Sequence, residues 1–417
     1  MRVVFIKFFI FVCLFVFFFQ LNGYDIEELA VSRYVFTPPA IAENGRSFVY
    51  TGVIGNTREI AIFVSHMNNN GTFSKPVPAV TTKMTVVGLN QRFNSFLPFS
   101  GQYTPTGFNS PTIQNDIIAF SGTLDNWKQG VFYAIKSSGR WQAYPIAMQG
   151  EKIPEKQKLF FKSFNAPYCT INSEVIFLAS LENKIDVVYK CRIPHHYNGE
   201  NITAELQCFS DANLFNFYNI SVAQGNFAMR AQTATGKSYI HVFDHAEKKL
   251  VIARPEDYTG LPKGNLSVGG PSFFDGKVAY SVSSSDEYGK VSYAIYTNAG
   301  NNRFSKPVVT SGKAINSSNS LLLKLLWNPT LFIKDNKAYI VFMGYLTENE
   351  STSGIYLAEI ENGKVSVKAV AVPGQKLSGN RIISSAEIGA VGIRNGVIPM
   401  ALKMNDGDSV IAVTKIY

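Results

Sequence analysis

Short apolar stretches alternate with tight polar turns along almost the whole chain. The clearest unit spans residues 271–297, PSFFDGKVAYSVSSSDEYGKVSYAIYT, where Pro271 opens a strand and Asp275-Gly276 turns the chain back into a second strand, with a third after a polar loop. Proline has no N–H to donate and is confined to strand starts and edges, and Asp-Gly is a preferred hairpin turn. The pattern therefore predicts a small antiparallel sheet.

Looser copies of this unit recur along the chain. With the clearest one there are seven, and their starts are 51 to 72 residues apart, at Pro39, Pro111, Pro167, Ile220, Pro271, Pro329 and Ala386. One such sheet cannot bury both of its faces alone, and a repeat of about 50 residues built from strands is typical of blades stacked around a ring. We therefore expect an all-β fold, a seven-bladed β-propeller.

The last copy supplies only three strands before the chain stops at Tyr417. Residues 26–32, IEELAVS, form a strand without a local partner. We expect this N-terminal strand to close the last blade, because closure ties the two ends of the chain together and removes an exposed sheet edge. No linker or change of composition interrupts residues 24–417, so we expect them to form a single β-propeller domain and a monomer.

The first 23 residues differ from the rest. Residues 3–21 are almost entirely apolar behind Met1-Arg2, and the chain turns polar after Gly23. This pattern predicts a signal peptide over residues 1–23 and a secreted protein, extracellular or in the lumen of the secretory pathway. The alternative is an uncleaved anchor, since the apolar run is long enough to approach a membrane span. A membrane is an expected partner only in that case.

Charge says little about partners. Without residues 1–23 the chain keeps 37 basic and 30 acidic residues, a formal net charge of +7. The densest basic stretch, residues 151–162, also carries acids, whereas a nucleic-acid site needs a basic patch or stripe. We expect a solvated loop there, with contact to an acidic glycan or an anionic surface as the alternative, and we expect no nucleic-acid partner.

Three cysteines remain after removal of the predicted signal peptide: Cys169, Cys191 and Cys208. In an oxidising compartment two of them are expected to pair. A hairpin centred near Gly199 would set Cys191 opposite Cys208, which favours a disulfide between them. A Cys169 to Cys191 bridge is the alternative.

The chain also carries Asn-x-Ser/Thr sequons, which mark acceptor sites for N-glycosylation in a secreted protein. They predict a glycoprotein modified at Asn70, Asn201, Asn219, Asn265, Asn316 and Asn349.

The connections that lead into the innermost strands are rich in aromatic residues. An aromatic-Asn-Pro motif recurs there, as FNSP from Phe108, FNAP from Phe164 and WNP from Trp327. One interpretation is that the rings wedge between blades while Asn supports turns. The other is that some of them line a ligand pocket at one mouth of the central channel, because loops on a rigid scaffold commonly carry function.

The pattern FNSPTIQNDIIAFSGT followed by GVFYAI resembles the repeats of secreted seven-bladed β-propeller proteins of an uncharacterised, bacterial-surface type. The similarity extends over most of residues 26–417. It implies the propeller fold and carries no catalytic residue with it. Sialidase, WD and kelch signatures are absent from the sequence.

Two kinds of function fit these features. The first is a binding module that holds a glycan or an extracellular protein by aromatic stacking with basic residues at the rim, and the candidate ligand-binding residues are Trp127, Trp327, Phe164 and Lys162. The second is a carbohydrate hydrolase or lyase, whose carboxylates would come from equivalent loops, at Asp125, Asp186 and Asp286. A structural surface or matrix protein is a third alternative. We expect no metal and no cofactor.

Overall fold

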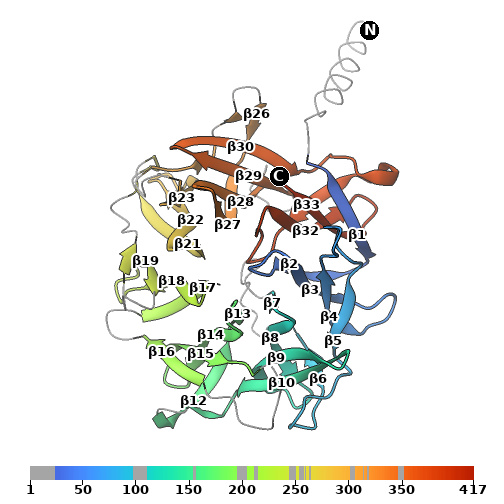
Figure 1. The fold of residues 1–417 in the computed structure, drawn as a ribbon. Coiled ribbons are helices and arrows are strands. Elements are labelled where there is room, and N and C mark those ends of the chain that lie inside the picture. Colours follow the sequence, from blue (N-terminus) through green and yellow to red (C-terminus); the bar gives the residue numbers. More distant parts are fainter. Residues whose placement is uncertain are drawn as a thin grey trace, which may run out of the picture.

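A computed structural model describes residues 24–96, 110–153, 156–194, 204–210, 215–243, 250–252, 258, 260–262, 264–300, 306–312, 314–316, 319–345 and 352–417. The predicted signal peptide, residues 1–23, lies outside this part. Seven antiparallel sheets stand around a ring (Figure 1), so the predicted seven-bladed propeller is confirmed. Within the described residues we find no helix that is both long and apolar enough to cross a membrane.

In blades 1 to 6 the strands follow in chain order from the centre of the ring outward, and in blade 7 the N-terminal strand is outermost. Blade 1 holds β2 (Val35–Ile41), β3 (Ser47–Val53), β4 (Ile60–His66) and β5 (Val77–Thr81). Blade 2 holds β6 (Phe93–Ser95), β7 (Thr112–Gln114), β8 (Ile117–Leu124), β9 (Gln129–Ser137) and β10 (Arg140–Met148). Blade 3 holds β11 (Lys152–Ile153), β12 (Lys156–Phe164), β13 (Tyr168–Cys169), β14 (Glu174–Leu181), β15 (Asp186–Arg192) and β16 (Ala204–Phe209).

The remaining blades have four strands each. Blade 4 holds β17 (Phe215–Ala223), β18 (Asn226–Gln232), β19 (Ser238–Phe243) and β20 (Leu250–Ile252). Blade 5 holds β21 (Asn265–Phe274), β22 (Lys277–Ser285), β23 (Val291–Thr297) and β24 (Val309–Thr310). Blade 6 holds β27 (Leu325–Lys334), β28 (Lys337–Tyr345), β29 (Ser353–Glu361) and β30 (Lys364–Ala371), and a hairpin of β25 (Ala314–Asn316) and β26 (Asn319–Leu322) precedes it. Blade 7 holds β31 (Ile383–Glu387), β32 (Val397–Met404), β33 (Ser409–Lys415) and β1 (Ile26–Ser32).

Blade 7 is closed by the N-terminal strand, as predicted. β1 pairs antiparallel with β33, from Ile26 opposite Thr414 to Ser32 opposite Ser409. Outside the ladder, the Thr414 hydroxyl donates to the Asp25 carbonyl at 2.7 Å. The Glu28 carboxylate pairs with Arg381. The two ends of the chain therefore hold one sheet together.

The core lies in the seams between neighbouring blades. Phe161 and Phe164 of blade 3 are buried together with Tyr133 and Tyr144 of blade 2. Phe93 fills the seam between blades 1 and 2 in the same way. These aromatic residues of the connecting segments therefore pack as wedges between blades, because each sheet has two apolar faces and only its neighbours can cover them.

The WNP copy of the aromatic-Asn-Pro motif sits at an irregularity of the innermost strand of blade 6. The pairing of β27 with β28 shifts register between Trp327 and Thr330. Asn328, inside this bulge, has a φ of 45°, a left-handed conformation that Asn tolerates better than most residues. The motif therefore bends the innermost strand.

The predicted disulfide is wrong. Cys208 lies opposite Val188 in the β15–β16 ladder, and Cys191 lies opposite Ala204. Cys191 packs in the seam toward blade 2, whereas Cys208 packs against the cluster that reaches blade 4, so the two side chains lie on opposite faces of blade 3. The three cysteines of the described residues form no disulfide with one another.

The alternative Cys169 to Cys191 bridge is also excluded. Both residues lie opposite Val175, in strands on either side of β14. Two strand spacings put their Cα atoms about 10 Å apart, beyond the roughly 7 Å limit for a disulfide.

Candidate functional site

The ring has two unlike faces. We call the face where the innermost strands begin, and where the second and third strands of each blade are joined, the top face. The face that carries the turns between the first and second strands is the bottom face. Five aromatic side chains of the described residues are exposed, and four of them lie at the top face: Tyr34, Phe36, Trp127 and Tyr288. The fifth, Tyr417, follows β33 at the bottom face.

Trp127 is the most unusual of these residues. It lies in the turn between β8 and β9, is 62% exposed and has a φ of 66°. Its N–H donates to the Leu124 carbonyl, and the Leu124 N–H donates to the Lys128 carbonyl. This is the three-residue hairpin in which a type I turn is followed by a left-handed residue, a position that favours glycine.

The same hydrogen-bond pattern recurs at the top face of five blades. The turns begin at Leu124, Leu181, Thr233, Asp286 and Met404 in blades 2, 3, 4, 5 and 7. The left-handed position holds Gly236, Gly289 and Gly407 in blades 4, 5 and 7, Lys184 in blade 3 and Trp127 in blade 2. A bulky side chain in this conformation costs about 1–2 kcal/mol. Blade 2 thus places an exposed indole where the fold itself prefers glycine.

Polar groups flank the indole. The Asp125 N–H donates to the Arg92 carbonyl at 2.9 Å, and the Arg92 N–H donates to the Asp125 carboxylate at 3.3 Å. The main chain of Arg92, next to β6, therefore holds the turn in place, and the side chains of Arg92 and Lys128 are exposed. An exposed ring on a turn that also carries cationic side chains can stack on a sugar or pack against a protein.

The structure does not gather the four predicted binding residues into one cluster. Lys162 is exposed on β12 of blade 3, next to the blade of Trp127. Phe164 is 9% exposed in the seam between blades 2 and 3. Trp327 is half-buried against the core between blades 6 and 7. Trp127 and Lys162 thus offer exposed side chains from adjacent blades, whereas Phe164 and Trp327 pack.

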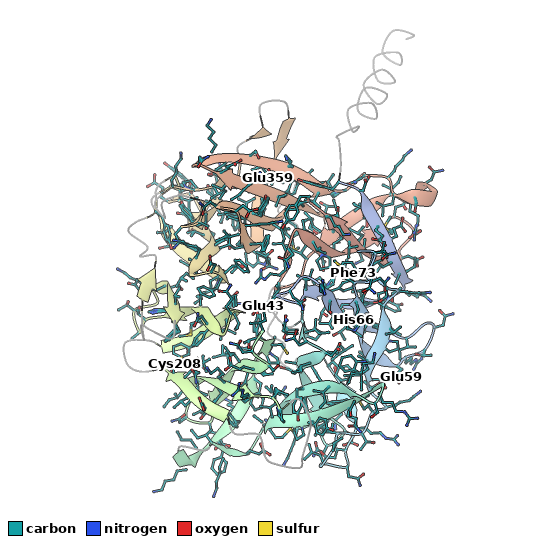
Figure 2. The ribbon with its side chains drawn as sticks, in the orientation of Figure 1. Glu43, Glu59, His66, Phe73, Cys208 and Glu359 are labelled. Atoms are coloured by element: carbon teal, nitrogen blue, oxygen red, sulfur yellow. The ribbon has the colours of Figure 1, made fainter. Side chains whose placement is uncertain are left out.

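The bottom face is tied together by Glu43, which the sequence did not single out. Its carboxylate accepts the Gln224 N–H of blade 4 at 3.1 and 3.2 Å, and its own N–H donates to Gln114 of blade 2 at 2.9 Å. Figure 2 shows Glu43 near the middle of the ring, as a side chain that links blades 1 and 4 must be. Burial raises the pKa of Glu43, and the charge of Arg394 partly offsets this effect.

Arg394 of blade 7 supplies the positive charge that interacts with Glu43. It is 1% exposed, its Nη1 donates to the carbonyls of Leu331 and Ile393 at 2.9 and 2.8 Å, and its guanidinium lies 4.8 Å from the Phe274 ring. Burial lowers its pKa to about 10, against the attraction of Glu43. These contacts join blades 5, 6 and 7, so the polar groups at this end hold the ring together.

A serine, a histidine and an aspartate also meet near the bottom face. Ser47 Oγ lies 3.0 Å from His66 Nδ1, and His66 Nε2 lies 3.7 Å from Asp116. The second distance is too long for a hydrogen bond, and Ser47 is 9% exposed. Desolvation lowers the pKa of His66 despite the nearby Asp116. Ser47 and His66 are a cross-strand pair, and their contact supports the sheet.

The three aspartates considered for hydrolysis are engaged separately. Asp186 accepts from the Ser180 hydroxyl at 2.5 Å and from the Phe217 N–H at 2.8 Å. Asp286 accepts two N–H groups of its own turn, and Asp125 accepts from Arg92. They belong to blades 3, 5 and 2, and each accepts hydrogen bonds from groups other than the remaining two aspartates. No group of three metal-ligating side chains occurs among the described residues.

Two of the predicted glycosylation sites are exposed in the structure, Asn70 in the β4–β5 connection and Asn265 at the start of β21. Asn219 is partly buried in β17, and Asn316 lies in β25. Asn201 and Asn349 lie outside the described residues.

No known protein family matches the chain, and no curated protein is similar to it in sequence. Solved structures with similar architecture include the WD40 domain of SCAP from fission yeast, at 10% identity over 95% of this chain and 98% of that one, with a TM-score of 0.39. The β-propeller domain of the Trilobed protease from Pyrococcus furiosus is 11% identical over 70% of this chain and 77% of that one, with a TM-score of 0.40. A Trypanosoma rangeli sialidase mutant with trans-sialidase activity is 9% identical over 79% of this chain and 56% of that one, with a TM-score of 0.38. Similarities this low say nothing about what this chain binds.

Proposed function

We propose that the protein is a secreted or lumenal β-propeller that binds a glycan at its top face, with Trp127 as the central contact. An extracellular protein is the second kind of ligand that such a surface fits. The observation that carries the proposal is the exposed Trp127 at a left-handed position that holds glycine in three equivalent turns. Strained residues concentrate at functional sites, where binding rather than folding accounts for them.

The asymmetry of the two faces supports this location. Among the described residues, four of the five exposed aromatic side chains lie at the top face, whereas polar contacts between blades tie the bottom face together. β1 starts at the bottom face, since Ile26 pairs with Thr414 at the end of β33. If residues 1–23 were retained as an anchor, the top face would point away from the membrane and toward a ligand.

The test is Trp127→Gly, measured on a glycan array with a chain that begins at Tyr24. Glycine suits the left-handed turn, so the free energy of unfolding should stay within about 1 kcal/mol of the wild type. Loss of a central aromatic contact costs about 2 kcal/mol or more of binding, so binding to the selected glycan should weaken at least tenfold.

Lys184→Gly is the matched control, because Lys184 occupies the same turn position in blade 3 with a φ of 65°. It should leave binding unchanged. Equal binding by Trp127→Gly and the wild type would contradict the proposed site. A wild-type chain that binds no glycan would contradict the glycan assignment and redirect the search to protein ligands.

A further inference from the structure

The turn that presents Trp127 has a counterpart in blade 5. Both turns share the same main-chain hydrogen bonds. Both also have an acid at the second position and a lysine at the fifth: Asp125 and Lys128 in blade 2, and Glu287 and Lys290 in blade 5. The aromatic residue stands at the fourth position in blade 2, as Trp127, and at the third in blade 5, as Tyr288. The equivalent turns of blades 3, 4 and 7 have no aromatic residue.

The blade 5 turn presents its aromatic residue on a fixed backbone. The Asp286 carboxylate accepts the Tyr288 N–H at 3.0 Å and the Lys290 N–H at 2.9 Å. Gly289 takes the left-handed position with a φ of 76°, so the tyrosine is free of the backbone strain found at Trp127. Tyr288 is 87% exposed, the highest exposure among the large hydrophobic side chains of the described residues.

We infer that the turn of Tyr288 is a second glycan-binding site and that the protein binds a repetitive glycan through both turns at once. This inference rests on the proposed function of Trp127. Blades 2 and 5 stand on opposite sides of the ring, as the positions of β8–β9 and β22–β23 show in Figure 1. One small sugar cannot contact both turns, so a ligand that uses both must present the same unit repeatedly, as a polysaccharide or a densely glycosylated surface does.

Two sites on one rigid face make binding depend on ligand density. Once one site is occupied, the second binds at a high effective concentration, and the apparent affinity for a dense surface can exceed that of one site by about 10²–10⁴ fold. Each site alone gives weak binding that does not respond to density.

The experiment uses neoglycoprotein arrays on which N-acetyllactosamine, its sialylated form, high-mannose and chito-oligosaccharide conjugates are each printed at low and at high density. The wild-type chain should bind one class with an apparent Kd at least 100-fold lower at high density. Tyr288→Ala should bind the low-density spots almost as the wild type does, through Trp127, and lose the gain at high density. The Tyr288→Ala, Trp127→Gly double variant should bind neither the low-density nor the high-density spots.

The outcomes separate the two proposals. Wild-type binding that is equal at both densities, or a Tyr288→Ala variant that keeps the full gain, overturns the second site. If Trp127→Gly binds the glycan at least tenfold more weakly than the wild type in that case, the proposed function is supported without the second site. If Tyr288→Ala loses binding while Trp127→Gly keeps it, the proposed Trp127 site fails. A wild-type chain that binds no printed glycan overturns this inference. Tyr288 is exposed, and its main-chain contacts remain in Tyr288→Ala, so the variant is expected to fold.

Discussion

Arg394 is a single side chain on which three blades depend. Its guanidinium is buried, donates to two carbonyls and lies over the Phe274 ring. A buried charge is tolerated only when its hydrogen bonds and counter-charge are in place. The carboxylate of Glu43, in the adjacent blade 1, supplies the attraction of an opposite charge.

Arg394→Met should therefore lower the free energy of unfolding by about 3 kcal/mol or more. Urea denaturation measures the change, and Arg140→Met at an exposed position is the control. The Glu43→Gln, Arg394→Met double variant should lose less than the sum of the two single variants, because the two groups interact. Strict additivity would show that they do not.

Glu387 makes a pH-dependent contribution to stability, and it destabilises the fold when its carboxyl group is ionised. Burial raises its pKa above the ordinary value of 4.5, and the charge of Lys403 offsets only part of this effect. A carboxyl group with a raised pKa in the folded state destabilises the fold once it ionises. Stability from this group is therefore present below about pH 4.5 and is lost as the pH rises through the folded pKa.

Glu387→Gln should accordingly be more stable than the wild type at pH 7 to 8 and should match it near pH 4. Chemical denaturation at several pH values tests this expectation, with Glu182→Gln at an exposed turn as the control. A variant that loses stability at pH 8 would mean that the ionised carboxylate stabilises the fold.

Among the described strands, β1 joins the N-terminal end of the chain to a sheet built from its C-terminal end. Seven residues cover the edge of β33 and bring Leu29 and Ala30 against the core. The contacts of Glu28 with Arg381 and Ser378 fasten the strand to the loop before β31. Without β1, blade 7 would have three strands and an open edge.

Two truncations test this role. A chain that begins at Tyr24 keeps β1 and should unfold as the full-length chain does. A chain that begins at Arg33 lacks β1 and should lose about 3 kcal/mol or more, since the apolar contacts of Ile26, Leu29 and Ala30 disappear. Calorimetry compares the two, and equal midpoints would show that closure contributes little.

In the molecule as a whole, the residues that hold the ring together lie on one face and the exposed aromatic residues proposed to bind ligand lie on the other. The bottom face carries Glu43, Arg394 and the contacts that cross the ring, whereas the top face carries Trp127 and Tyr288 on turns that leave their rings exposed. A ring closed by both chain ends holds such turns at fixed positions, so two sites on different blades keep a constant separation. That constancy is what a ligand of regular repeat requires.

The sequence by itself determined the architecture. The strand-turn-strand units, their period and the lone strand of residues 26–32 predicted seven blades and the closure of the last one, because alternation and turn residues act locally. Trp127 was also singled out from the sequence. A comparison of the repeats could have revealed that glycine stands at its position in other blades.

Only the tertiary structure decided the remaining features, because they depend on strand register and on the closed ring. The register of β15–β16 sets Cys208 opposite Val188 and Cys191 opposite Ala204, which removes the predicted disulfide. The link from Glu43 to Gln224 joins residues 181 positions apart in the chain, and no local pattern encodes such a contact. Burial likewise assigned Phe164 to a seam and left Trp127 exposed, since neighbouring blades cover the faces of each sheet and leave its turns open to solvent.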